Sequence, residues 1–163
     1  MSAIDRLLEN NRAFVSSFED RGLEARPRTK VAVVACMDAR LNLFAALGLH
    51  EGDAHVIRNA GGVITDDAIR SLAISQRLLG TEEVMLIHHS GCGMLGLSDD
   101  RFLAEVEEDA GRRPDWSPEG FADLDDDVRR SIARVRDSPF IPGKASVRGF
   151  VYELETGRLR EVS

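Results

Sequence analysis

The sequence is poor in the residues that stabilise small secreted domains and in those that contact nucleic acids. It contains two cysteines, one tryptophan and one tyrosine among 163 residues. Acidic residues outnumber basic ones by 28 to 21, and the formal net charge is -7. We find no basic stripe, which a nucleic-acid-binding surface would need. The composition therefore argues against a nucleic-acid partner.

Long apolar runs are also missing. No stretch approaches the roughly 20 apolar residues of a membrane-spanning helix, and the segment from Met1 to Arg6 lacks the charged-then-apolar pattern of a signal peptide. We therefore expect a cytoplasmic protein without a membrane partner. In that reducing compartment, two lone cysteines are metal ligands, catalytic thiols or core residues more often than a structural disulfide.

The remaining composition is that of an ordinary globular protein, with 43% hydrophobic and 30% charged residues. A chain of 163 residues is long enough to bury about two-thirds of the surface that its unfolded form exposes. We expect one domain over residues 1–163, in which residues 1–29 form an N-terminal helical arm and linker.

Short apolar runs that alternate with helical patterns predict the fold class. The strand-like runs are Val31–Ala35, His55–Ile57, Val84–Ile87, Ser146–Leu154 and Leu159–Val162. The first is a continuous run of the kind found in parallel strands that are buried on both faces. This order predicts a three-layer α/β fold in which helices flank a mainly parallel central sheet.

Four of the predicted helices have recognisable start residues or apolar faces. Thr65 precedes the best-marked helix, which carries Asp66 and Asp67 in its first turn, and Ser98 precedes an acidic helix with Phe102, Leu103 and Val106 facing inward. A third helix carries Val128, Ile132 and Val135 on one face. The N-terminal helix has a strong apolar face and precedes the first strand, so a partner subunit is one candidate for the surface that it contacts.

Two stretches carry the residues with chemical potential: Cys36-Met37-Asp38-Ala39-Arg40 and His88-His89-Ser90-Gly91-Cys92-Gly93. Each holds one of the two cysteines and follows a predicted buried strand, where α/β proteins place their chemistry. Two thiolates and one imidazole are the ligands of catalytic zinc sites that keep a fourth position open. The stretches would converge if the two strands were neighbours.

Asp38 lies two residues from Cys36, close enough in sequence either to bind a zinc ion or to accept a hydrogen bond from a zinc-bound water. Arg40 can hold that carboxylate through two parallel hydrogen bonds. A lone cysteine after an apolar strand is usually a core thiol. Here the second cysteine, the neighbouring histidine and the Asp38–Arg40 pair favour a metal site instead. Among the other histidines, His88 is expected in the core, and His50 and His55 are either proton shuttles or surface residues.

Cys36-x-Asp38-x-Arg40 followed by His89-x-x-Cys92-Gly93 resembles the signature of the β-class carbonic anhydrases, in particular their compact bacterial and archaeal branch. The resemblance covers most of the chain, including the loop Arg58–Gly61. It implies hydration of carbon dioxide to bicarbonate by zinc-bound hydroxide, with one zinc ion per chain, in a homodimer or homotetramer. It also implies that Cys36, His89 and Cys92 are the zinc ligands and that Asp38 and Arg40 form the catalytic dyad.

Three alternatives to this interpretation remain. The first is a hydrolase of carbonyl sulfide or carbon disulfide, because family members with that activity share the same ligands. Many relatives carry Thr-Asp where this chain has Ser90-Gly91, and this difference bears on the choice of substrate. A structural zinc protein would use Asp38 as a permanent fourth ligand. A thiolate phosphatase is disfavoured, because such enzymes place five residues between cysteine and arginine and because Asp38 would repel a phosphate.

Overall fold

The computed structural model describes residues 1–163. Its helices are α1 (Ala3–Val15), α2 (Leu43–Leu47), α3 (Asp66–Arg77), α4 (Asp99–Ala110) and α5 (Leu124–Asp137), with one 3₁₀ turn, η1 (Ala60–Gly62). Its strands are β1 (Val31–Cys36), β2 (Ala54–Asn59), β3 (Glu83–His89), β4 (Val147–Tyr152) and β5 (Leu159–Val162). Each predicted strand and helix is present.

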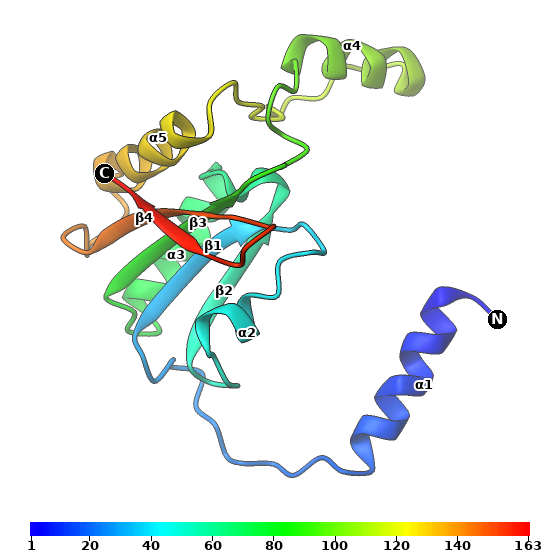
Figure 1. The fold of residues 1–163 in the computed structure, drawn as a ribbon, viewed down its shortest axis with the longest axis vertical. Helices are drawn as coiled ribbons and strands as arrows, with labels where there is room; N and C mark the ends of the chain where they lie inside the picture. Colours follow the sequence, from blue (N-terminus) through cyan, green and yellow to red (C-terminus); the bar gives the residue numbers. More distant parts are fainter.

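The five strands form one sheet in the order β2-β1-β3-β4-β5 (Figure 1). The first four are parallel, and β5 pairs antiparallel with β4 at the edge. The predicted mainly parallel sheet is therefore confirmed. β1 lies between β2 and β3, with Cys36 opposite Asn59 on one side and Val34 opposite Leu86 on the other.

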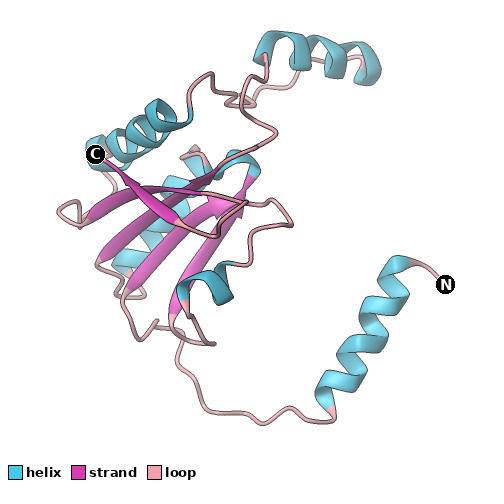
Figure 2. Cartoon of the chain, viewed as in Figure 1, coloured by secondary structure: helices cyan, strands magenta, loops and turns pink.

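Helices flank both faces of the sheet (Figure 2). α3 and α5 share one face, where Ala68, Leu72 and Val135 pack with Val34 and Leu86 of the central strands. The other face is covered by α2 and by loops, and its core is built from a separate set of buried side chains: Val33, Ala35, Cys36, Leu41, Leu43, Val63, Ile87, Cys92 and Phe121. Cys36 and Cys92, the two cysteines predicted to bind a metal, both belong to this second core.

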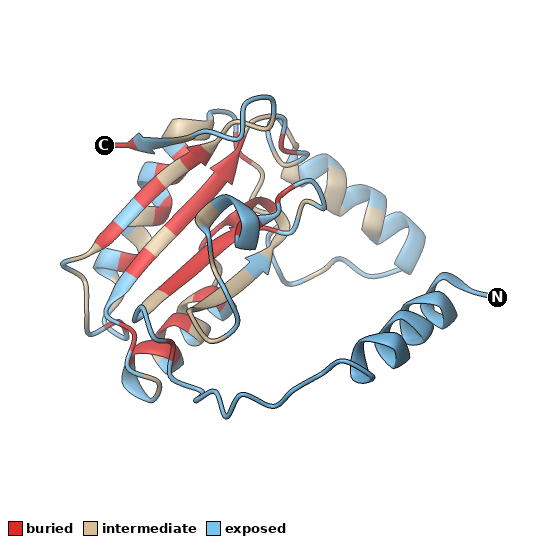
Figure 3. Ribbon diagram, turned by 60° about the horizontal axis from the view of Figure 1, so that its bottom comes forward, coloured by how far each residue is buried: buried red, intermediate tan, exposed pale blue.

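Two helices lie away from the core (Figures 1 and 3). α1 begins with Ser2 and Asp5 in a reciprocal capping box, yet it has no buried residue. α4 also has no buried residue, so the expectation that Phe102, Leu103 and Val106 face a core is wrong for this chain alone, where they are only half-buried. The sequence pattern identified the apolar face of each helix, but it could not show whether that face packs against the core of the same chain.

Strand boundaries differ from the predicted ones at the carboxyl ends. β2 continues past Ile57, so Arg58 and Asn59, expected in a loop, are strand residues. β1 includes Cys36 and β3 includes His89. The strand ends were predicted from where each apolar run stops, and these residues lie just beyond that point. Their backbones nevertheless remain paired with the neighbouring strands. No helix in the chain is long and apolar enough to cross a membrane.

Gly62 allows η1 to pack directly against the ends of β1 and β3. Its φ angle is +72°, and a Cβ atom at this position would lie 2.8 Å from the Cys36 nitrogen and 3.0 Å from the Ile87 oxygen. Both neighbours are backbone atoms of central strands, so neither can yield cheaply. The glycine therefore joins the η1 turn to the strand that carries Cys36.

Replacing Gly62 by Ala should lower the free energy of unfolding by about 3 kcal/mol or more, because backbone overlap adds to the cost of left-handed geometry. Gly80→Ala is the matched control, since Gly80 has a φ of +74° but no neighbouring atom within 4 Å of its added Cβ. It should lose only about 1 kcal/mol. Urea denaturation measures both values, and equal losses would contradict the role assigned to Gly62.

Candidate metal centre

The parallel pairing of β1 with β3 brings the predicted ligand residues together. Cys36 ends β1, His89 ends β3, and Cys92 lies in the turn that follows. All three side chains are buried, and their ligand atoms lie within 4.8 Å of one another. The two Sγ atoms are 3.9 Å apart. The sequence-predicted cluster is therefore present in three dimensions.

The spacing of the two sulfurs fits a tetrahedral zinc ion. Zinc–sulfur bonds of about 2.3 Å at tetrahedral angles place two sulfurs about 3.8 Å apart, close to the observed spacing. The Nδ1–H of His89 donates to the Ser90 carbonyl at 2.9 Å. Because Nδ1 carries the proton, the lone pair of Nε2 is available to bind a metal ion. Nε2 is buried and has no hydrogen-bond partner in the chain. A metal ion would complete its coordination.

The two thiols share their protons unequally. The neighbouring Cys92 thiol lowers the pKa of Cys36 against the effect of burial, and the nearby His89 imidazole and the backbone of Asp38 and Gly61 lower it further. The neighbouring Cys36 thiol and burial raise the pKa of Cys92 above its ordinary value. The two thiols therefore titrate as one unit, in which one proton is held more tightly than the other. A metal ion would have to displace that proton.

Asp38 and Arg40 form an ion pair at the edge of the cluster. Arg40 donates from Nε and Nη2 to the two carboxylate oxygens at 2.9 and 2.7 Å, and its backbone nitrogen donates to the same carboxylate. These hydrogen bonds hold the pKa of Asp38 well below its usual range. Asp38 Oδ2 also lies 3.7 Å from His89 Nε2. The ionised Asp38 carboxylate therefore lies beside His89 Nε2.

An apolar cavity of about 600 Å³ opens next to the cluster. Its lining includes Met37 and Gly93, each adjacent in sequence to a thiol ligand, and side chains from α4 and the following loop, Phe102 and Trp116. The sequence offered no signal for this cavity, because its lining residues are far apart in the chain. Such a space suits a small uncharged molecule.

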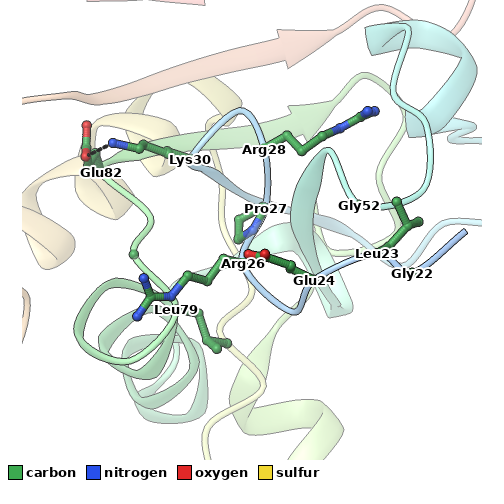
Figure 4. A pocket seen from close by; sticks show the side chains of 11 residues that line it. Gly22, Leu23, Glu24, Arg26, Pro27, Arg28, Lys30, Gly52, Leu79 and Glu82 are labelled. Atoms are coloured by element: carbon green, nitrogen blue, oxygen red, sulfur yellow. Dashed lines mark hydrogen bonds and ion pairs between the residues drawn. The ribbon is translucent and has the colours of Figure 1, made fainter.

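A second cavity, of about 550 Å³, lies at the opposite end of the sheet, where the linker meets the start of β1 (Figure 4). Lys30 there pairs with Glu82 at 2.6 Å, and Arg28 pairs with Asp53 at 2.5 Å. None of its lining residues is a cysteine or histidine. It therefore lacks the thiol and imidazole groups that are gathered in the cluster at the carboxyl ends of the strands.

The other histidines do not join the cluster. His88 is fully buried, as expected, and its Nε2 lies 2.7 Å from Asp127 of α5. His55 is bonded through both ring nitrogens, to Ser75 at 2.7 Å and to the Ala25 carbonyl at 3.1 Å. It pairs with Ala32, roughly 13 Å along β1 from Cys36. His50 precedes β2 at the same far end of the sheet.

Arg58 is the residue whose role sequence reasoning missed. The sequence predicted a loop over Arg58–Gly61. Asn59 and Ala60 do line the apolar cavity. In addition, the Arg58 side chain reaches from β2 to the carbonyl oxygens of Cys36 and Asp38. An arginine at a strand end gives no sequence signal that distinguishes this contact from a surface charge.

A buried Cys-His-Cys cluster with a charged carboxylate beside it, at the carboxyl ends of a parallel sheet, is a group of side chains that could hold a metal ion. Comparison with known proteins makes this assignment specific. Residues 31–159 match a family model described as carbonic anhydrase.

The chain is 51% identical over 163 residues to β-carbonic anhydrase 1 of Mycobacterium tuberculosis, covering 100% of this chain and 99% of that protein. A crystal structure of carbonic anhydrase from Streptococcus mutans is similar with a TM-score of 0.93 and 41% identity, covering 100% and 99%. A carbon disulfide hydrolase of Acidithiobacillus thiooxidans is 38% identical over 149 residues, covering 78% and 74%. The chain belongs to the β-class carbonic anhydrases, which are lyases.

The cluster predicts pH-dependent zinc binding. We expect about one zinc ion per chain, with an affinity that rises between mildly acidic and mildly alkaline pH, because the metal competes with protons on Cys92 and His89. The sign follows from their pKa values: that of Cys92 is raised, and that of His89 is also raised because its hydrogen bonds and the Cys36 thiolate outweigh burial. Chelator competition measures the affinity.

Cys92→Ser and His89→Ala should each lose the ion in that assay. His50→Ala is the matched histidine control, and it should bind zinc like the unmodified chain because His50 is exposed and far from the cluster. Retention of one tightly bound zinc in Cys92→Ser would sink the assignment of the centre.

Proposed function

We propose that this chain catalyses the zinc-dependent, reversible hydration of carbon dioxide to bicarbonate and a proton. The observation that carries the proposal is the buried cluster in which His89 Nε2, without a partner, faces two thiol sulfurs. In this proposal Cys36, His89 and Cys92 bind the zinc ion, one per chain. Asp38 and Arg40 are the catalytic dyad.

The metal supplies one part of the chemistry: zinc held by three protein ligands lowers the pKa of a water in its fourth position to about 7, which provides hydroxide near neutral pH. The chain's own groups supply orientation. Asp38 stays ionised because Arg40 holds its pKa low, so its oxygens accept hydrogen bonds and donate none. With the ion bound, Asp38 would accept a hydrogen bond from the metal-held water or hydroxide and so orient it.

Arg40 fixes this acceptor in place. Two of its nitrogens bind the carboxylate, and Nη2 also donates to the Gly91 carbonyl at 3.1 Å. The dyad is thus tied to the turn between His89 and Cys92. The neighbouring apolar cavity, lined by Met37, Val63 and Met94 among others, admits an uncharged substrate without desolvating an ion.

Stopped-flow hydration of carbon dioxide on protein of known zinc content tests the function. We expect activity that rises from mildly acidic to alkaline pH. Asp38→Asn and Arg40→Ala should keep one zinc per chain but lower kcat by about tenfold or more, because the attacking water loses its oriented acceptor.

Arg148→Ala is the matched control for the dyad. Arg148 forms a similar two-bond pair with Glu161, at 2.7 and 2.6 Å, but on β4 and β5 away from the cluster. Its kinetics should equal those of the unmodified chain. Unchanged kinetics in Asp38→Asn at every pH would remove the dyad from the mechanism, and zinc-loaded protein without hydration activity would overturn the proposal.

Hydrolysis of carbon disulfide or carbonyl sulfide on the same ligands is the second candidate. Relatives at 38% and 33% identity are described as carbon disulfide hydrolases. Sulfide release from carbon disulfide by zinc-loaded protein that fails to hydrate carbon dioxide would select this alternative. A protein inactive with both substrates would be left with a structural zinc site.

We also propose that the chain works as a homodimer or homotetramer in the cytoplasm, with residues 1–29 as an arm that contacts a second copy. The support is the face of α1, on which Ile4, Leu7 and Leu8 are 68%, 65% and 52% exposed. An apolar helix face of this size is unstable in water without a partner. The cytoplasmic assignment rests on the two thiols, which must stay reduced to bind zinc.

Leu8→Asp should weaken this association by about tenfold or more, because it places a charge within the apolar face. Ala13→Asp is the control, since residue 13 lies on the opposite side of the same exposed helix. Sedimentation equilibrium measures both. An unmodified chain that remains monomeric at micromolar concentration, or equal effects of the two variants, would contradict the proposed contact.

A further inference from the structure

Arg58 makes contacts that are unusual for an arginine near the surface. Its Nε donates to the Cys36 carbonyl at 2.9 Å, and its Nη2 donates to the Asp38 carbonyl at 2.7 Å. The two acceptors lie on either side of Met37 in the segment that leaves β1. A planar guanidinium can span two acceptors in this way, whereas a lysine ammonium is a single point of charge.

The segment from Cys36 to Asp38 needs support from outside itself. Cys36 is the last paired residue of β1, and the Met37 side chain that follows it is 63% exposed. β2 supplies the support at three points, because the Asn59 carbonyl also accepts a hydrogen bond from the Met37 nitrogen at 2.7 Å. Two of the three bonds come from the single side chain of Arg58. Its removal would leave the backbone position of Asp38 much less defined.

The position of Asp38 decides whether the centre is open. Asp38 Oδ2 is 3.7 Å from His89 Nε2, so a small movement of the turn brings a carboxylate oxygen into reach of a metal on that nitrogen. The competing interaction is with Arg40, whose side chain is 59% exposed. The Asp38 side chain is only 17% exposed and accepts three hydrogen bonds from Arg40, so the pair holds the carboxylate firmly relative to the turn. Arg40 lies on the same turn as Asp38, so bonds from another strand are what fix the backbone of that turn.

We propose that Arg58 is a positioning residue that holds the Cys36–Asp38 turn so that the Asp38 carboxylate stays beside the metal position and does not occupy it. The inference rests on the metal site of the proposed function and names one more residue on which that site depends. Arg58 also lines the neighbouring cavity, but through these two bonds it does not touch the cluster atoms. It acts through the backbone of the two residues whose carbonyls it binds.

Cobalt-substituted protein tests the inference without recourse to catalysis. Cobalt bound by two thiolates gives charge-transfer absorption, and its visible bands report what fills the remaining position. Azide binding to that position, followed by these bands, should be about tenfold or more weaker in Arg58→Ala than in the unmodified chain. Arg58→Lys should show an intermediate loss. Arg77→Ala is the control, because Arg77 also donates to a backbone carbonyl, that of Phe140 at 3.0 Å, but on α3.

The decisive comparison uses a background without the carboxylate. If Arg58 acts by keeping Asp38 off the metal, Arg58→Ala should have no effect on azide binding in a chain that already carries Asp38→Ala. An equal loss in both backgrounds would show a purely structural role and overturn the inference. So would unchanged azide binding in both Arg58→Ala and Arg58→Lys. Absence of thiolate charge-transfer absorption in the unmodified chain would instead reject the metal site of the proposed function.

Discussion

The parallel pairing of β1 with β3 is the constraint on which the centre depends. The register places Val34 opposite Leu86 and Ala35 opposite Ile87, so the two strands end side by side. Ligands separated by more than fifty residues in sequence thereby come within 4.8 Å. The strands are anchored by fully buried side chains such as Val34, Leu86 and Ile87, which have no polar alternative to this packing. The hydrophobic core thus sets the metal geometry before any metal binds.

The sequence was sufficient for the fold class and for the members of the cluster, for identifiable physical reasons. Continuous β-branched runs have few alternatives to a buried strand, and side-chain caps such as Thr65 mark a helix start through a local hydrogen bond, here to Ala68. The only two cysteines fall at two of those strand ends. Local pattern and parallel topology together therefore predicted which residues would meet.

The features that the sequence did not predict depend on distant contacts. Arg58 and Asn59 interrupt an apolar run, so the predicted strand stopped at Ile57, whereas hydrogen bonding to β1 extends β2 to Asn59. The exposed faces of α1 and α4 have the same periodicity as core-facing helices, so their pattern cannot show what covers them. The apolar cavity beside the cluster combines residues from separate loops and helices. Each of these depends on side chains that meet only after folding.

The charges around the centre form a consistent arrangement. Two thiolates bring two negative charges, which balance a divalent cation, and the Asp38–Arg40 pair adds no net charge. A neutral reactant can thus approach through the apolar cavity without an electrostatic barrier. The buried ligands therefore set the electrostatics, and the Asp38–Arg40 pair, held through the backbone by Arg58, orients the reactants.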